Sequence, residues 1–122
     1  MSRKNILVVE DEQVIQILCH RLLDRPPYDL ALVGSVREAA GLIKDGPLDL
    51  LITDLRLPDG DGVEVIHHAR QLHPDCKIII ITGSPTPEER FKKIQALPVT
   101  EYISKPFEVD IFVSAVRRAL GE

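Results

Sequence analysis

Five short apolar runs, rich in β-branched residues, alternate along the chain with stretches of helical periodicity. The runs cover residues 6–9, 30–33, 48–53, 78–81 and 102–103. Apolar runs without polar alternation are typical of strands buried on both faces, as in a parallel sheet, and these runs are too short for helices. The last run is the weakest of the five.

Between these runs, apolar residues recur every three to four positions, as they do along one face of an amphipathic helix. The periodic stretches cover residues 14–22, 36–43, 63–72, 88–96 and 109–120. The stretch 88–96 is polar and weakly amphipathic, whereas the last stretch is the most regular. Ser35 and Glu38 form a capping-box pattern, in which hydroxyl and carboxylate satisfy free backbone N–H groups at a helix start.

Strict alternation of strand and helix predicts βαβ units with right-handed crossovers. We therefore expect an α/β fold in which helices cover both faces of a five-stranded parallel sheet. The 122 residues contain no internal repeat or linker and fit one domain, residues 1–122. In such open sheets, functional groups gather outside the carboxyl ends of the strands.

The charge and hydropathy of the chain exclude several classes of function. Fifteen basic and nineteen acidic residues give a net charge of −4, which provides no general attraction to nucleic acids or anionic membranes. No apolar run approaches the roughly 20 residues that span a bilayer, and the N-terminus lacks a secretory pattern. Cys19 and Cys76 lack metal-site spacing and are predicted to be free thiols. We expect a cytoplasmic protein.

Polar groups that can do chemistry follow four of the five predicted strands. Glu10 and Asp11 follow the first run, Asp54 the third, Thr82 the fourth, and Lys105 comes shortly after the fifth. One acid at a strand end could simply cap the next helix. Carboxylates, a hydroxyl and an ammonium on four strands are much harder to attribute to chance.

This combination suits an acyl-phosphate site. Carboxylates offer the hard oxygen ligands that Mg²⁺ prefers, and one of them can attack phosphorus as a nucleophile. The hydroxyl and the ammonium can stabilise charge on the transferring group. Asp54 is the best candidate nucleophile because it ends the central run and precedes a turn-rich loop. Packing Glu10, Asp11 and Asp54 together should raise the pKa of at least one of them.

Four motifs resemble those of the receiver domain of bacterial response regulators, and the likeness covers nearly the whole chain. They are VVEDE at 8–12, DLRLPDGDG at 54–62, Thr82-Gly83, and Lys105-Pro106-Phe107, where the family often has a cis peptide before the proline. The resemblance implies a flavodoxin-like, doubly wound (βα)5 fold with strand order 2-1-3-4-5. It also implies a signalling domain, rather than an enzyme, that is phosphorylated in a Mg²⁺-dependent reaction.

The resemblance implies roles for the residues at the strand ends. Asp54 would accept the phosphoryl group. Glu10, Asp11 and Asp54, with the backbone carbonyl of Arg56, would hold Mg²⁺, for which Mn²⁺ could substitute. Glu10 departs from the aspartate that is usual at its position, which favours metal contact through water.

Further matching residues would read out or limit the phosphorylated state. The Thr82 hydroxyl would hydrogen-bond the phosphoryl group, and the Lys105 ammonium would form an ion pair with it. Tyr102 would be the aromatic residue whose rotation accompanies the switch. Arg56 and Ser84 would border the attacking water and tune hydrolysis. Two prolines in the segment 82–87 depart from the family pattern and should delay the start of the helix predicted over 88–96 and stiffen the loop before it.

The resemblance also implies partners. A sensor histidine kinase or a histidine phosphotransfer protein would donate the phosphoryl group. A downstream protein or output domain would contact the face formed by the fourth predicted helix (88–96), the fifth strand (102–103) and the fifth helix (109–120). No direct binding of nucleic acid or membrane by this chain is expected.

Two alternatives stay open. A pseudo-receiver would bind partners without phosphorylation, but its usual mark is loss of an acid, the threonine or the lysine, and all are present here. A small phosphatase of the dehalogenase type would need a second aspartate two residues after its nucleophile. Arg56 occupies that position.

Overall fold

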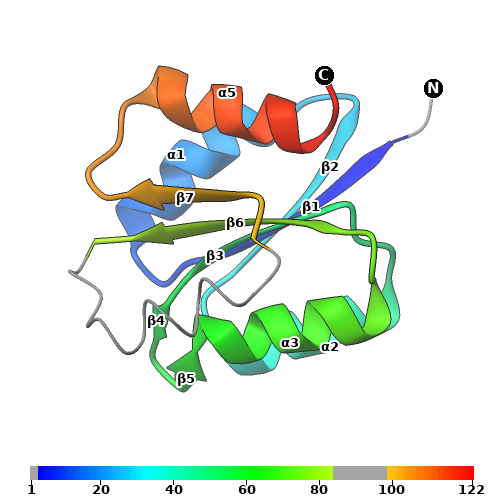
Figure 1. Ribbon diagram of the computed structural model, residues 1–122. Helices are drawn as coiled ribbons and strands as arrows, with labels where there is room; N and C mark the ends of the chain where they lie inside the picture. The colour runs from blue at the N-terminus through cyan, green and yellow to red at the C-terminus, as the bar shows by residue number, and fades with distance from the viewer. Residues whose placement is uncertain (1–2, 84–98) are drawn as a thin grey trace.

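Five parallel strands form the central sheet of the computed structural model, which describes residues 3–83 and 99–122 (Figure 1). The strands are β1 (Lys4–Val9), β2 (Tyr28–Val33), β3 (Leu50–Asp54), β6 (Lys77–Thr82) and β7 (Glu101–Ser104). They lie in the order β2-β1-β3-β6-β7, and every neighbouring pair is parallel. In chain order this is 2-1-3-4-5, so the predicted flavodoxin-like α/β fold is confirmed.

Helices cover both faces of the sheet. In the described part of the chain they are α1 (Gln13–Leu23), α2 (Val36–Asp45), α3 (Gly62–Leu72) and α5 (Val109–Ala119). Figure 1 shows α1 and α5 on one face and α2 and α3 on the other. The helix predicted over 88–96 lies outside the described residues.

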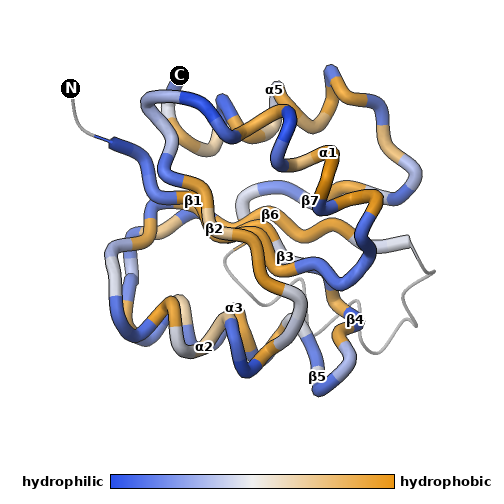
Figure 2. The backbone as a smooth tube through the Cα atoms, turned by 180° about the vertical axis from the view of Figure 1, so that it is seen from behind, coloured by the Kyte–Doolittle hydropathy of each residue, from blue (hydrophilic) through white to orange (hydrophobic). Residues whose placement is uncertain are grey.

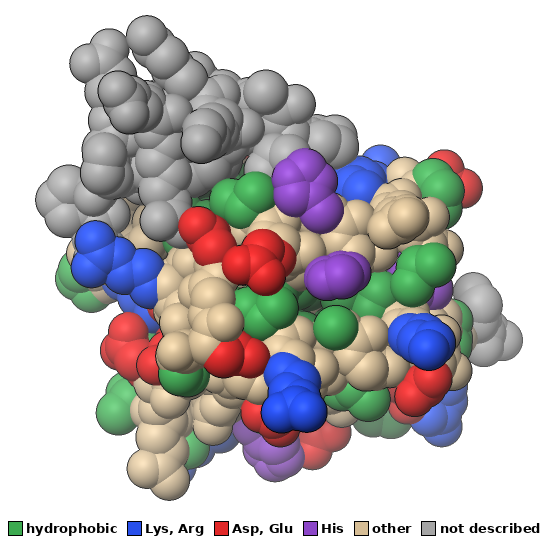
Figure 3. Space-filling view, turned by 90° about the horizontal axis from the view of Figure 1, so that it is seen from below, with side chains coloured by type: hydrophobic (Ala, Val, Ile, Leu, Met, Phe, Trp, Pro, Cys, Tyr) green, Lys and Arg blue, Asp and Glu red, His purple; other side chains and the backbone are tan. Residues whose placement is uncertain are grey.

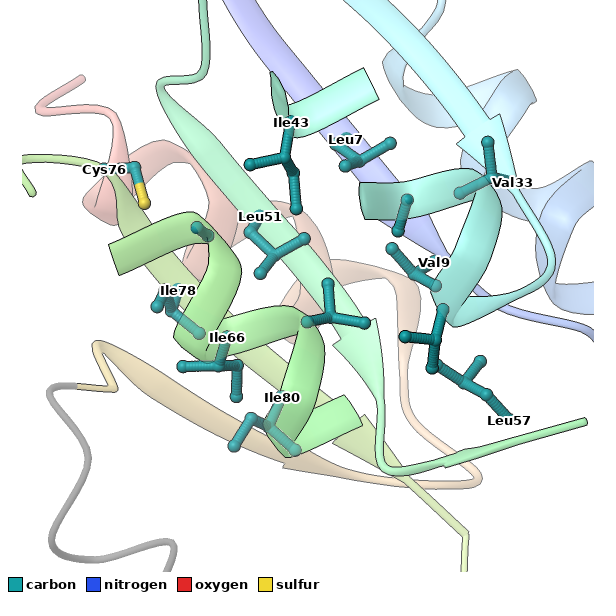
Figure 4. Close-up of a cluster of buried hydrophobic side chains, with 14 of the residues drawn as sticks. Leu7, Val9, Val33, Ile43, Leu51, Leu57, Ile66, Cys76, Ile78 and Ile80 are labelled. Carbon is teal, nitrogen blue, oxygen red and sulfur yellow. The ribbon is translucent and has the colours of Figure 1, made fainter. Parts of the chain in front are cut away.

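Two apolar layers explain why the strands are continuously hydrophobic. Along β6, Ile78 and Ile80 belong to the core layer under α2 and α3, which Figure 4 shows. Ile79 and Ile81 alternate with them and belong to the layer that contains Phe112 of α5. Successive side chains of a strand point to opposite faces, so a strand covered on both sides needs apolar residues throughout. The hydrophobic colouring is accordingly concentrated on the central strands in Figure 2.

Strand boundaries differ from the prediction because backbone pairing continues past the apolar residues. The first strand begins at Lys4 rather than at residue 6, since Lys4 and Asn5 pair with Tyr28 and Asp29 of β2. The turn-rich loop expected after β3 contains a small hairpin of β4 (Arg56–Leu57) and β5 (Gly60–Asp61).

Side chains cap two of the helices. The Ser35 hydroxyl accepts a bond from the N–H of Glu38 at 3.1 Å, as predicted for the start of α2. The Glu38 carboxylate accepts from the Ser35 hydroxyl, however, so the reciprocal half of the predicted capping box does not form. Asp61 caps α3 by accepting from the N–H of Val63.

Cys19 and Cys76 are free and buried, and burial raises the pKa of Cys19 to about 12. From the side of α2 and α3, acidic and basic side chains are interspersed (Figure 3). Among the described residues, no helix is long and apolar enough to span a membrane.

Candidate functional site

The buried polar residues of the described chain gather at the carboxyl edge of the sheet. They are Glu10, Thr53, Asp54 and Thr82. The register explains their proximity: Val9 pairs with Thr53 and Asp54 with Ile81, so the strands end at similar heights. Glu10 directly follows β1, and its N–H donates to the carbonyl of Val33 at 2.9 Å. Of the residues predicted at the strand ends, the structure thus brings together Glu10, Asp54 and Thr82.

Lys105 reaches into this cluster from the segment after β7. Its Nζ lies 2.8 Å from Asp54 Oδ2, 2.8 Å from Glu10 Oε2 and 2.9 Å from Glu12 Oε1. The peptide bond between Lys105 and Pro106 is cis, as the family resemblance implied, and the Lys105 N–H donates to the carbonyl of Thr82. The lysine is therefore held at the site by its backbone as well as by its charge.

The electrostatics of the cluster keep Lys105 charged. Its side chain is 9% exposed, and burial alone lowers the pKa of an ammonium. Hydrogen bonds to Asp54, Glu10 and Glu12 outweigh that effect, so the pKa of Lys105 is raised. One lysine faces three carboxylates, and the cluster as a whole stays negative.

Glu10 is the most strongly buried acid of the site. Its side chain is 0% exposed, and burial is the largest cause of a raised pKa. The Lys105 ammonium and a hydrogen bond from the N–H of Glu12 oppose the rise, and the charge of Asp54 adds to it. The expectation that one of the clustered carboxyls has a raised pKa is therefore confirmed. Its main cause is burial rather than the repulsion between acids on which the expectation rested.

Sequence reasoning missed Glu12. One ligand oxygen from each of Glu10, Glu12 and Asp54 lies within 4.8 Å of the others, whereas Asp11 is exposed and is not in this group. The signal was available, because alternate residues of an extended segment point the same way and Glu12 lies two positions after Glu10. The Glu12 side chain is 58% exposed and forms the outer wall of the cluster.

These oxygens fit a divalent cation. Mg²⁺ takes hard oxygen ligands about 2.1 Å away and usually keeps several waters, so a few carboxylates suffice. The buried Oε2 of Glu10 has the ion pair with Lys105 but no well-aligned hydrogen bond among the described residues. It therefore retains capacity for a further positive ligand.

The remaining predicted residues lie around this cluster. Asp54 Oδ1 accepts a hydrogen bond from the N–H of Arg56 at 3.2 Å, and the Arg56 side chain is exposed. Thr82 is buried at the end of β6. Tyr102 is 36% exposed on β7, where it pairs with Ile80. Ser84 lies outside the described residues.

Comparisons with known proteins point to one family. A family model described as the response regulator receiver domain matches residues 6–117. Response regulator protein PilR of Pseudomonas aeruginosa is 32% identical over 120 residues, covering 98% of this chain and 27% of PilR. The DNA-binding transcriptional regulator NtrC of Azospirillum brasilense is 32% identical over 121 residues, covering 99% of this chain and 25% of NtrC. The chain thus spans about a quarter of these two relatives.

A solved structure matches over almost its full length. The signal receiver domain of an HD domain-containing protein from Pseudomonas fluorescens Pf-5 superposes with a TM-score of 0.88 and 29% identity. The match covers 98% of this chain and 95% of that one. The superposition therefore extends over the sheet and the described helices.

Proposed function

The chain belongs to the response regulator receiver domain family, and from this premise we propose that it is a switch operated by phosphorylation of Asp54. The observation that carries the proposal is the contact between Lys105 Nζ and Asp54 Oδ2 at 2.8 Å within a cluster of acids. A carboxylate beside an ammonium and a cation site is equipped to receive a phosphoryl group. We propose residues 1–122 as one receiver domain.

The chemistry of the transfer assigns a task to each contact. An oxygen of Asp54 attacks the phosphorus of a donor phosphohistidine, so that a P–O bond forms as the P–N bond breaks. The N–H of Arg56 orients the carboxylate through Oδ1. Lys105 then exchanges a carboxylate oxygen for a phosphoryl oxygen, and the hydroxyl of Thr82 donates to another.

Magnesium completes the site in this proposal. Glu10, Asp11 and Asp54, with the backbone carbonyl of Arg56, would hold the ion, and Glu12 joins them because of its place in the cluster. Mg²⁺ supplies positive charge that offsets the charge of the phosphoryl group, and Mn²⁺ could substitute for it. Lys105 would give up contacts to Glu10 and Glu12 as the ion binds, since two cations compete for the same oxygens.

Phosphorylation would act on partners by changing the surface formed by β7 and α5, on the side of the sheet edge where Thr82 lies. Movement of the Thr82 hydroxyl toward the phosphoryl group would be read by Tyr102 and by the face that contains β7 and α5. A sensor histidine kinase or histidine phosphotransfer protein would donate the phosphoryl group. A downstream protein or output domain would bind the changed face. Arg56 and Ser84 would border the water that hydrolyses the phosphoryl group.

Intact-mass measurement tests the phosphoacceptor directly. The native protein and Asp54→Asn are each incubated with acetyl phosphate in two samples, one with Mg²⁺ and one with a chelator in place of the ion. We expect one added phosphoryl group on the native protein with Mg²⁺ and none in the other three samples. If the native protein binds Mg²⁺ but gains no phosphoryl group, the proposal fails and a binding module without phosphorylation becomes the better interpretation.

A further inference from the structure

The loop between β3 and α3, residues 55–61, is tied to the start of α2, whose first two residues lie 23 and 22 positions before Asp59 in the chain. Asp59 Oδ1 accepts from the N–H of Val36 at 2.8 Å, and Oδ2 accepts from the N–H of Arg37 at 3.0 Å. These are the first two residues of α2, whose N–H groups have no partner within the helix. Both oxygens of one carboxylate are therefore used to cap a distant helix.

The bond pattern favours an ionised carboxylate. The hydrogen bonds from Val36 and Arg37 are the largest causes of a lowered pKa at Asp59. Negative charge is also stabilised near the positive end of a helix dipole. The exposed Asp59 carboxylate is therefore ionised, and able to accept both bonds, at neutral pH.

The tip of the loop is also packed against both neighbouring helices. A Cβ on Gly60 would lie 3.2 Å from Val36 Cγ2 of α2 and 3.0 Å from Glu64 Oε1 of α3. Leu57 and Val36 belong to the same buried cluster. The loop thus fits closely between α2 and α3, and Asp59 supplies its polar attachment to α2.

The start of α2 is in turn connected to the acidic edge. The N–H of Glu10 donates to the carbonyl of Val33, three residues before α2. A Cβ on Gly34 would lie 3.8 Å from both the Glu10 carbonyl oxygen and the Asp11 Cα. The segment held by Asp59 therefore runs alongside the acids that follow β1.

The other arm of the loop carries the backbone of Arg56. Arg56 pairs with Asp61 in the small hairpin, and its N–H donates to Asp54 Oδ1. The contacts run from Glu10 through Val33 and the start of α2 to Asp59, and on through Arg56 to Asp54. Lys105, which contacts both Asp54 and Glu10, closes them into a ring. Asp59 provides the hydrogen bonds between the loop and α2 in this ring.

We propose that Asp59 is a positioning residue for the phosphorylation site. By holding the loop 55–61 against α2, it sets where the Arg56 backbone lies relative to Asp54 and to the acids after β1. The inference rests on the proposed function, because the Arg56 carbonyl is there a ligand of Mg²⁺. Residues that orient a metal ligand typically change metal affinity by about 10- to 100-fold when removed.

A purely structural role for Asp59, as a stabiliser of α2, predicts different behaviour. Ser35 separates the two roles because it caps the same helix through hydrogen bonds with Glu38, within α2 itself. Ser35→Ala weakens the start of α2 without removing the tether to the loop. It is therefore the matched control for Asp59→Ala.

The experiment compares the native protein with Asp59→Ala, Asp59→Asn and Ser35→Ala. Mg²⁺ affinity is measured by calorimetry, and hydrogen exchange of the Arg56 amide is measured by NMR. Thermal unfolding is followed by circular dichroism, and phosphorylation is followed by intact-mass spectrometry. We expect Asp59→Ala to weaken Mg²⁺ binding by about tenfold and to speed exchange at Arg56 by a similar factor. Ser35→Ala should lose comparable stability but change both values by less than about twofold. Asp59→Asn keeps one acceptor and should fall between the native protein and Asp59→Ala.

The outcomes separate this inference from the proposed function. If Asp59→Ala and Ser35→Ala behave alike in Mg²⁺ affinity and Arg56 exchange, Asp59 is only a helix cap and the inference is overturned. If the native protein accepts no phosphoryl group, the proposed function fails. The exchange of the Arg56 amide requires neither ion nor phosphoryl group, so it still decides whether Asp59 holds the loop.

Discussion

Gly62 lies so close to Asp54 that a Cβ at position 62 would collide with the Asp54 carbonyl oxygen. The contact is made by backbone atoms, which cannot move aside as a flexible side chain can. The Gly62 N–H also donates to the Leu55 carbonyl at 2.9 Å, so α3 begins directly against the end of β3. Glycine at position 62 thus allows α3 to start against the end of β3, where the candidate phosphoacceptor Asp54 lies.

Gly62→Ala should destabilise the protein, because the new methyl group forces the backbone apart at the end of β3. We expect a loss of about 1–3 kcal/mol, the usual cost of overpacking, in the free energy of unfolding measured with urea. Gly41→Ala is the control: it lies within α2 with open space around it and should stabilise the protein by about 0.5–1 kcal/mol. Equal effects of the two substitutions would contradict the close contact.

Asp54→Asn should stabilise the protein in the absence of Mg²⁺. The substitution removes a buried charge beside two other acids, while Lys105 keeps Glu10 and Glu12 as partners. We expect a gain of about 1 kcal/mol, or roughly 4 °C in Tm for a chain of this size. Mg²⁺ should raise the Tm of the native protein more than that of the variant. Identical Tm values with and without the ion would mean that the acids do not form one cation site.

Lys105→Met should have opposite effects on stability and on Mg²⁺ affinity. Without the ammonium, Glu10 is buried beside acids and unpaired, so the metal-free protein should lose about 3 kcal/mol. Mg²⁺ should bind at least about fivefold more tightly, because a competing positive charge has left the cluster. Lys44→Met, on the exposed surface of α2, is the control and should leave the affinity unchanged. Weaker Mg²⁺ binding by Lys105→Met would show that the two cations do not compete.

Acid should weaken the tether at Asp59. Its folded-state pKa is lowered from the ordinary 3.8, so its contribution is complete above that value and is lost as the pH falls through the lowered one. The stability difference between the native protein and Asp59→Asn should therefore shrink as the pH falls below about 4. Urea unfolding of both proteins over this range measures the difference, from which acids common to both cancel. A difference that stays constant down to pH 2 would refute the assignment.

The sequence was most informative where burial dictates composition. Ile78 to Ile81 had to be a strand covered on both faces, because alternate residues enter different core layers. Glu10, Asp54 and Thr82 were found because polar residues directly after such strands share one edge of the sheet. Their roles in phosphoryl transfer stay predictions, as do those of Asp11, Tyr102 and Ser84.

The order of the elements, the fold class and the edge where the chemistry lies could therefore be predicted from local patterns, since each follows from the burial of short runs. Which atoms meet at that edge depends on how the chain folds. Glu12 lies beside Lys105 across a separation of 93 residues, and Asp59 beside Val36 across 23. No periodicity encodes such contacts, because they depend on strand register and on where loops are anchored. For that reason the contact between Glu12 and Lys105, and the tether at Asp59, emerged only once the chain was folded.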